Sequence, residues 1–205
     1  MATLPKIIRE MESTLGPRVR KAYLLSERVH RGARRKSGEP YITHPIAVAK
    51  ILYDAGGDSD IICAALLHDT VEESPNSVDV TGTIYTDFGD HVLFLVEAMS
   101  KDETIADKTD QQAAYIEQIQ RAFVLDIFAF LIKIADLIHN MSTISSLPKK
   151  RREPWLQELR YEYLPLFSEY FHRVPLAHRE VYQKLMEAAE KVLQSYEMDS
   201  QPRKS

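Results

Sequence analysis

Two imidazoles and two carboxylates are the side chains of this sequence best suited to hold a metal ion together. They are His44, the adjacent pair His68 and Asp69, and Asp136. Such a mixed set of nitrogen and oxygen ligands suits a first-row divalent cation, for example Mn²⁺, Fe²⁺, Co²⁺ or Zn²⁺. The four positions lie too far apart in sequence for a zinc finger or a single binding loop. We therefore expect them to meet in the interior of a folded domain, where a bound metal would be catalytic.

Asp136 stands in an otherwise apolar run, between Ala135 and Leu137. An ionised carboxylate in such surroundings is costly unless a cation or hydrogen bonds compensate its charge, and a metal ion would do so. Asn140 follows one helical turn later and faces the same cavity, where it could contact a substrate or orient a ligand. His139, three residues after Asp136, is better explained as a packed or ligand-supporting residue than as a ligand.

The segment 58–73 is predicted to be a helix that carries four ionisable side chains along one side. Glu72 follows His68 by four residues and Asp69 by three, while Glu73 follows Asp69 by four. Adjacent ligands diverge by about 100° around a helix axis, which suits a metal lying between this helix and its neighbours. The two glutamates could instead be solvated carboxylates at a helix end, although negative charge there opposes the helix dipole.

The third motif joins a basic cluster to His44. Pro45 fits the first turn of a helix, which would place His44 at the helix cap. Arginine binds phosphate through two hydrogen bonds and can also stack on a nucleotide base. A basic cluster beside a metal ligand therefore favours a phosphorylated substrate, whereas without that ligand it would be explained as a solvated helix end. The cluster comprises Arg31, Arg34, Arg35 and Lys36.

Helical periodicity dominates the chain, because apolar residues recur at three- and four-residue steps and alternating strand patterns are almost absent. The breaks between periodic segments contain the Gly, Pro, Ser and Asp residues that turns require. We see no internal repeat and no linker long enough to separate two domains. The fold class expected is all-α, with one helical domain over residues 1–198 and a polar, disordered tail at 199–205. Helices are predicted at 4–14, 17–34, 45–55, 58–73, 89–99, 108–122, 124–143, 154–171 and 178–196.

The composition favours a cytoplasmic protein and is compatible with a small anionic substrate. A chain of 205 residues can bury a core without disulfides, and its single cysteine, Cys63, lies in an apolar run. Residues 1–15 mix charged with apolar side chains, so they do not form a signal peptide. The strongest apolar stretch, 123–135, contains charged residues and falls short of the roughly 20 residues that a membrane span requires. A net charge of −4 argues against nucleic acid as the main partner.

The motifs and their flanking residues resemble two nested families. The spacing of His, His-Asp and Asp on helices resembles the HD-domain superfamily of metal-dependent phosphohydrolases. The flanking residues, over 20–145, resemble more narrowly the hydrolase half of the RelA/SpoT family. Enzymes of that family use Mn²⁺ to remove the 3′-pyrophosphate from guanosine tetra- or pentaphosphate, (p)ppGpp. The resemblance is carried by RKSGEPYI through HP at 35–45, ALLHD through Glu72 at 65–72, FG at 88–89, and IKIAD through HNM at 132–141.

The resemblance implies a role for each motif residue. His44, His68, Asp69 and Asp136 would be the metal ligands, and Glu72 and Glu73 would act on water. The substrate contacts implied are Arg35, Lys36, Ser37, Asn140 and Thr143. Because the chain has no room for the synthetase or regulatory domains of the family, we expect a stand-alone small alarmone hydrolase. The resemblance also leaves open whether Tyr161 or Tyr163 closes over the nucleotide.

Three positions depart from the family pattern, which usually has Asp at the position of Glu73 and Arg at the positions of Leu137 and Ser142. Glu73 keeps the charge on a longer arm, so this carboxylate could reach differently. The loss of Arg at Ser142 removes a candidate phosphate contact. Substrate identity is therefore less well specified by the sequence than the type of reaction.

Other functions fit parts of the sequence. The same scaffold could act on another phosphorylated nucleotide, such as an adenosine alarmone or the 2′-phosphate of NADPH. It could also bind a nucleotide as a regulator without turnover, although the complete ligand set and the acidic pair argue against this. The basic run 149–152 could contact nucleic acid, but four charges at the start of a helix usually form a solvated face. The sequence carries no signal for the oligomeric state.

Overall fold

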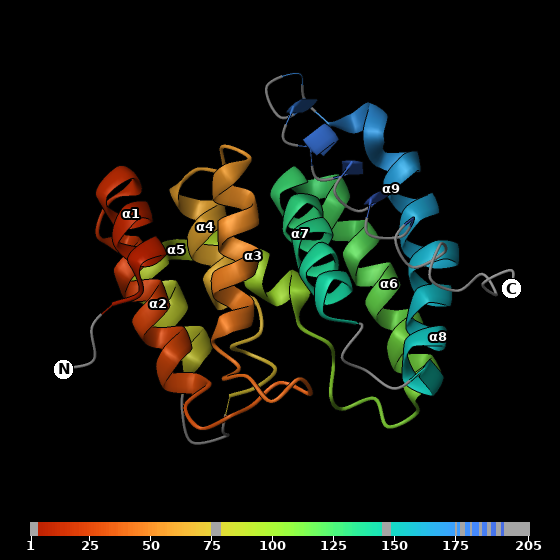
Figure 1. The fold of residues 1–205 in the computed structure, drawn as a ribbon, viewed down its shortest axis with the longest axis horizontal. Helices are drawn as coiled ribbons and strands as arrows, with labels where there is room; N and C mark the ends of the chain where they lie inside the picture. Colours follow the sequence, from red (N-terminus) through yellow and green to blue (C-terminus); the bar gives the residue numbers. More distant parts are fainter. Residues whose placement is uncertain are drawn as a thin grey trace, which may run out of the picture.

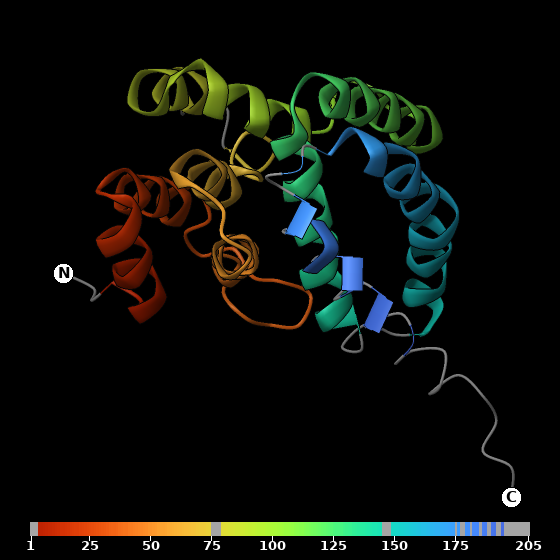
Figure 2. The ribbon, with the colours of Figure 1, turned by 90° about the horizontal axis from the view of Figure 1, so that it is seen from above.

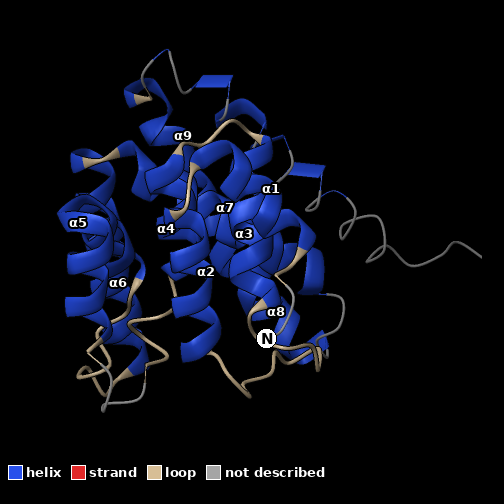
Figure 3. Cartoon of the chain, turned by 90° about the vertical axis from the view of Figure 1, so that its left-hand side faces the viewer, coloured by secondary structure: helices blue, strands red, loops and turns tan. Residues whose placement is uncertain are grey.

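The computed structural model describes residues 4–74, 79–144 and 149–174, together with scattered residues between 176 and 194. These residues form nine α-helices, one π-helical segment and one 3-10 segment. Helices surround the core on every side and no strand occurs in the described part of the chain (Figure 3). The predicted all-α class is therefore confirmed.

Two groups of helices lie on either side of the middle of the molecule (Figure 1). The first half of the chain supplies α1 to α4, and the second half supplies α6 to α9, while α5 and α6 lie along one side when the molecule is seen from above (Figure 2). Helix α3 packs against α7 and so joins the two groups. The helices are α1 Lys6–Leu15, α2 Arg18–Val29, α3 Thr43–Asp54, α4 Ser59–Leu67, α5 Val80–Met99, α6 Lys108–Leu125, α7 Ile127–Thr143, α8 Lys149–Glu158 and α9 Leu164–Tyr170.

The most deeply buried helices are α4 and α7, and both carry motif residues. Every residue of α4 from Ile61 to Leu67 is buried, and so is every residue of α7 from Ala129 to Ile138. A helix that is apolar all round must lie inside the fold, because no face of it can be left in water without cost. Cys63 belongs to this core, and burial raises the pKa of its thiol to about 11.

Aspartate side chains define where four of the helices begin. Asp58 caps α4, Asp79 caps α5, Asp107 caps α6 and Asp126 caps α7, each by accepting hydrogen bonds from backbone N–H groups in the first turn. Such caps satisfy donors that have no partner within the helix. The caps at Asp58 and Asp126 fix the starts of the two helices whose later residues reach the candidate site.

Several predicted boundaries are wrong. The helix predicted at 17–34 ends at Val29, because the chain turns at Gly32, which has a φ of 83°. The segment 89–99 is only the second half of α5, which begins at Val80 and bends at Gly89. The residues expected to open the helix at 124–143 are the end of α6, and α7 starts after Asp126.

The C-terminal part of the chain is less regular than expected. The helix predicted at 154–171 begins at Lys149, contains Pro154, and passes through the π-helical segment Leu159–Tyr163 before α9. About half of the residues in the helix predicted at 178–196, and all of the tail at 199–205, lie outside the described residues. The residues of 178–196 that are described are helical. Among the described helices, none is both long and apolar enough to cross a bilayer.

Candidate active site

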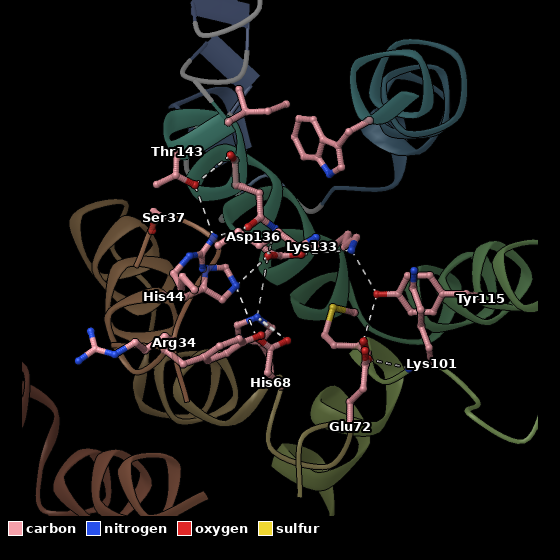
Figure 4. A pocket seen from close by; sticks show the side chains of 18 residues that line it. Arg34, Ser37, His44, His68, Glu72, Lys101, Tyr115, Lys133, Asp136 and Thr143 are labelled. Carbon is pink, nitrogen blue, oxygen red and sulfur yellow. Dashed lines mark hydrogen bonds and ion pairs between the residues drawn. The ribbon is translucent and has the colours of Figure 1, made fainter. Parts of the chain in front are cut away.

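Three side chains from three different helical regions converge at the centre of the fold (Figure 4). His44 comes from the first turn of α3, His68 from the residue after α4, and Asp136 from the middle of α7. One ligand atom of each lies within 4.8 Å of the others. The Nε2 atom of His44 is 3.1 Å from Oδ1 of Asp136, and Nε2 of His68 is 3.9 Å from the same oxygen. All three residues are buried.

Asp69 lies beside this group and faces both imidazoles. Its Oδ1 atom is 3.1 Å from Nε2 of His68, and its Oδ2 atom is 3.5 Å from Nε2 of His44. The hydroxyl of Tyr41 donates a hydrogen bond of 2.8 Å to Oδ2, which fixes the rotation of the carboxylate. Burial alone would raise the pKa of Asp69, but the neighbouring imidazoles hold it below its usual value.

The protonation pattern of His68 fits a metal ligand. Its Nδ1 atom lies 2.9 Å from the carbonyl oxygen of Ala65, so Nδ1 carries the proton and donates to that oxygen. The lone pair is then on Nε2, which is buried and forms no hydrogen bond, because the nearby Asp69 oxygen lacks hydrogen-bond geometry. A buried nitrogen without a hydrogen-bond partner needs an explanation. A cation held between the imidazoles and carboxylates would supply it.

His139 contacts the Nδ1 atom of His44, which is the ring nitrogen that does not face Asp136. The Nδ1 atoms of the two rings are 2.7 Å apart, so one ring donates a hydrogen bond to the other. Burial lowers the pKa of His139 to about 4, so this ring is neutral and can accept. A metal ligand at Nε2 of His44 requires the proton on Nδ1, and His139 provides the acceptor for it. This agrees with the prediction that His139 is a supporting residue.

The two carboxylate oxygens of Asp136 have separate partners. Oδ1 accepts a 2.7 Å hydrogen bond from Nδ2 of Asn140 and faces the imidazoles, whereas Oδ2 accepts from Nζ of Lys133 at 3.2 Å. Burial alone would raise the pKa of Asp136, but Lys133 and the imidazoles hold it well below its usual range. The carboxylate is therefore ionised and oriented, as a metal ligand must be.

A pocket of about 410 Å³ opens over these side chains. That volume is in the range that holds one small-molecule ligand. Of the predicted basic cluster, Arg34, Arg35 and Lys36 line the pocket, whereas Arg31 pairs with Glu27. All five predicted substrate contacts line it as well, namely Arg35, Lys36, Ser37, Asn140 and Thr143.

The structure separates the two glutamates of the acidic pair. The Glu72 side chain lines the pocket, where its Oε2 accepts a 3.3 Å hydrogen bond from the backbone N–H of Lys101. Glu73 does not belong to the described lining. Burial raises the pKa of both carboxyls above the usual value, with Asp69 adding to the effect. Glu72 is therefore the better placed of the two to exchange a proton with a molecule in the pocket.

Two details of the predicted local geometry are wrong. Helix α4 ends at Leu67, because both the amide and the hydroxyl of Thr70 bond to the carbonyl of Leu67 and tighten the chain into a turn. His68, Asp69 and the glutamates therefore do not share one side of a helix. His44 is also not a helix cap, because α3 already begins at Thr43.

Sequence analysis missed several pocket residues. Lys133 carried the clearest signal, since a lysine inside an apolar helix is costly to bury unless it has a charged partner. Neither of the tyrosines considered as a cover lines the pocket, since Tyr163 is buried beside Lys133 and Tyr161 is exposed. The departures from the family pattern at 137 and 142 also lie outside the described lining. The lining residues not predicted are Arg34 as a direct contact, Tyr41, Met99, Lys101, Tyr115, Lys133, Ile144 and Trp155.

A family model decides the classification of the chain. The model described as "HD domain" matches residues 22–169, a segment that includes all four predicted metal ligands. The chain belongs to the HD domain family. The matched segment contains the adjacent His68 and Asp69, which lie beside His44 and Asp136 in this HD domain.

Curated relatives of this HD domain are longer proteins. A bifunctional (p)ppGpp synthase/hydrolase, SpoT, of Escherichia coli is 42% identical over 164 residues, which are 78% of this chain and 22% of the relative. A GTP pyrophosphokinase of Streptomyces coelicolor is 37% identical over 157 residues, which are 77% of this chain and 18% of the relative. The chain thus spans about a fifth of the length of these relatives.

Two solved structures share the fold of this HD domain. One is of a metazoan ortholog of SpoT that hydrolyzes ppGpp, with a TM-score of 0.62 and 24% identity, covering 93% of this chain and 98% of that one. The other is of a protein from Listeria monocytogenes, with a TM-score of 0.55 and 23% identity, covering 76% of this chain and 99% of that one. At these identities the likeness concerns the fold.

Proposed function

We propose that this HD domain is a metal-dependent hydrolase that removes the 3′-pyrophosphate from guanosine tetra- or pentaphosphate. The products would be GDP or GTP and pyrophosphate. The observation that carries the proposal is the convergence of His44, His68 and Asp136 within 4.8 Å, at the base of a pocket lined by basic side chains. The names of the relatives point to the same substrates.

The names of the relatives do not by themselves select hydrolysis, since some are hydrolases and others are pyrophosphokinases. Pyrophosphate transfer to GTP requires a second nucleotide as donor, and the pocket volume of about 410 Å³ suits a single ligand. The buried, hydrogen-bond-free Nε2 of His68 favours a metal site at the base of this pocket. Hydrolysis needs only one nucleotide, a metal ion and water, which is what this arrangement can hold.

The proposed ligands are His44, His68, Asp69 and Asp136, with Mn²⁺ as the proposed ion. A bound divalent ion would lower the pKa of water toward neutrality and neutralise charge on the phosphoryl oxygens. Asp69 lies beside the other three and is oriented by Tyr41, so it can complete the set.

The acid–base work is assigned to Glu72, with Glu73 as an outer carboxylate. In the reaction, the water oxygen bonds to the inner phosphorus of the 3′-pyrophosphate, and the bond from that phosphorus to the ribose O3′ breaks. Glu72 takes a proton from the water, and O3′ takes up a proton from solvent as it leaves. The basic side chains Arg35 and Lys36 would hold the nucleotide, with Ser37 and Thr143 as polar contacts. Asn140 acts differently, because its amide is engaged with Asp136.

The first test is hydrolysis of guanosine tetraphosphate by metal-stripped protein, with and without added Mn²⁺. We expect release of GDP and pyrophosphate only with the metal. An adenosine alarmone and NADPH, tested in parallel, decide whether another phosphorylated nucleotide is preferred. No release from protein shown to bind Mn²⁺ would reject the proposed function.

One variant distinguishes the loss of a metal ligand from the loss of the fold. Asp69→Ala should abolish turnover, a loss of at least about 1000-fold, because it removes a ligand and the partner of Tyr41. The matched control is Asp54→Ala, which removes an exposed carboxylate from the end of α3. Both variants should melt within a few degrees of the wild type. Near-normal, metal-dependent turnover by Asp69→Ala would refute the ligand assignment.

A further inference from the structure

One end of the pocket carries two lysines that face the same aromatic ring. The Nζ atoms of Lys101 and Lys133 each lie 5.0 Å from the centre of the Tyr115 ring, and both side chains line the pocket. A tyrosine face attracts an ammonium group and helps to hold it in a defined position. This end of the pocket therefore has two ammonium groups held against one aromatic ring.

Lys101 is held without being neutralised. Its Nζ donates to Oε1 of Gln112 at 3.1 Å, and Nε2 of the same amide donates to Glu158 at 2.6 Å. The amide orientation is thus set from α8, and its oxygen is turned toward the lysine. Within the described ranges, Lys101 forms no ion pair with a carboxylate. Glu72 is the nearby carboxylate, and it bonds to the backbone N–H of Lys101 rather than to Nζ, so the ammonium group can still meet an anion in the pocket.

Lys133 connects this end of the pocket to the candidate metal site. Its side chain is buried, and Nζ binds both the Tyr115 hydroxyl and Oδ2 of Asp136 at 3.2 Å. The other oxygen of Asp136 faces the imidazoles. An anion that reached from the imidazoles toward Tyr115 would therefore pass over Lys133 and arrive at Lys101.

The opposite side of the site carries a different kind of cation. In Figure 4 Arg34 and Ser37 lie on one side of His44, His68 and Asp136, and Lys101 and Tyr115 lie on the other. Arginine can bind phosphate through two hydrogen bonds and stack on a base, whereas lysine acts as a compact point charge suited to phosphate oxygens alone. A nucleotide cleaved at the centre has a nucleoside on one side of the broken bond and a phosphate group on the other.

We propose that Lys101 and Lys133 form the subsite for the pyrophosphate group, across the metal site from the Arg34, Arg35 and Lys36 side that receives the nucleoside. This proposal rests on the proposed function and specifies how the substrate is oriented. It has a consequence for specificity. A single phosphate placed at the centre reaches Lys133, whereas the second phosphorus of a pyrophosphate extends the anion to Lys101. The pocket should thus prefer nucleotides that carry a pyrophosphate over those that carry a monophosphate at the cleaved position.

Glu72 is the carboxylate that shares this end of the pocket, through its bond from the backbone of Lys101. Its place fits the orientation proposed, because a proton acceptor for water should lie on the side of the phosphorus that faces away from the departing ribose oxygen.

The test measures the binding of each product separately, by calorimetry on the Mn²⁺-loaded protein. Lys101→Gln should weaken the binding of inorganic pyrophosphate about tenfold and leave GDP within about twofold, since a charged hydrogen bond is lost on one side only. Lys36→Gln is the matched comparison and should show the reverse. Lys101→Arg should restore most of the pyrophosphate affinity. Lys101 lies outside the helices, after the end of α5, and is partly exposed, so these variants should fold, which a melting curve verifies.

Two outcomes would overturn the subsite. One is unchanged pyrophosphate affinity in Lys101→Gln, and the other is an equal loss of pyrophosphate and GDP, which would indicate a general electrostatic effect. The result is independent of turnover. If the wild type failed to hydrolyse guanosine tetraphosphate but bound pyrophosphate in a Lys101-dependent way, the proposed function would fail and the subsite would stand.

Discussion

Arg35 and Asp136 are joined through one side chain, the amide of Asn140. The Arg35 guanidinium donates to Oδ1 of Asn140 at 2.9 Å, and Nδ2 of Asn140 donates to Oδ1 of Asp136 at 2.7 Å. Because the guanidinium can only donate, it fixes which end of the amide faces the carboxylate. The loop that is proposed to hold the nucleotide thus orients a proposed metal ligand on α7.

This link predicts that Asn140→Ala weakens metal binding even without nucleotide. The supports of a metal ligand typically contribute 10–100-fold to metal affinity, and we expect a loss of about tenfold here, because Lys133 still holds Asp136 Oδ2. Mn²⁺ binding measured by calorimetry or electron paramagnetic resonance checks it. Arg35→Lys, which keeps the charge but loses the fork that orients the amide, should give a smaller loss. An unchanged dissociation constant in Asn140→Ala would show that Asp136 needs no such support.

The position of Glu72 predicts the acid side of the pH profile. Burial raises the pKa of Glu72 above its usual value, so the carboxyl stays protonated to a higher pH than an exposed glutamate. As the base for water it must be ionised. The rate constant kcat/KM should therefore fall as the pH drops through this raised pKa and level off above it.

A pair of variants tests that assignment. Glu72→Gln should lower kcat by about 100- to 10,000-fold, the range typical of a lost general base, whereas Glu73→Gln should cost much less. Because the raised pKa means that folding disfavours the ionised form, Glu72→Gln should also melt at the same temperature as the wild type or higher. A rate that instead fell as the pH rose through this pKa would make Glu72 the acid that protonates the ribose oxygen.

The sequence was most informative about the site where a charged residue lies within an otherwise apolar segment. Asp136 could be predicted because a carboxylate in an apolar helix needs a cation, and the structure shows it against His44 and Lys133. The same argument applied to Lys133 would have predicted the salt bridge between them, three residues apart on one helix. Sequence patterns thus predict which charged groups need a partner in the folded protein. They are less informative about which residues those partners are.

Other features depended on contacts that no local pattern contains. The end of α4 is set by the hydroxyl of Thr70 bonding to the carbonyl of Leu67, although the helical periodicity continues past it. Lys101 follows the end of α5 and Trp155 lies on α8, so they reach the pocket from elements that are distant in sequence and meet only in the folded chain. The fold class followed from periodicity along the whole chain, which is why it was more predictable than helix ends.

The bend in α5 predicts a stability effect at Gly89. Its φ of 87° and ψ of 175° lie in a region that only glycine adopts without strain. Gly89→Ala should therefore destabilise the protein by about 1–3 kcal/mol through backbone strain. No atom outside the adjoining residues and the nearby backbone of the same helix lies within 4 Å of an added Cβ, so a clash with other parts of the fold would not contribute. Chemical denaturation measures the change in the free energy of unfolding, and Thr86→Ala on the same helix is the control. A loss below about 0.5 kcal/mol would mean that the bend relaxes at little cost.

His91 connects three helical regions and does not line the described pocket. Its Nδ1 atom lies 3.0 Å from Asp60 on α4, and its Nε2 atom lies 2.8 Å from Asp126, the cap of α7. Arg18 of α2 also pairs with Asp60. Burial alone would lower the pKa of His91, but the hydrogen bonds to the two carboxylates raise it, while those from His91 and Arg18 lower the pKa of Asp60.

These shifts give the network a window of pH in which it stabilises the fold. Because the pKa of His91 is raised on folding, its contribution is complete below the unfolded value of about 6.5 and disappears as the pH rises through the folded value. The contribution of Asp60 has the opposite pH dependence and disappears as the pH falls through its lowered pKa.

His91→Gln should therefore lower the melting temperature more at about pH 5.5 than at about pH 9. The effect should stay below about 1 kcal/mol, because the His91 side chain is 38% exposed and solvent screens the pair. His172→Gln removes an exposed imidazole outside the network and should show no such difference. An equal loss at both pH values would mean that His91 acts through packing against Phe128 rather than through its charge.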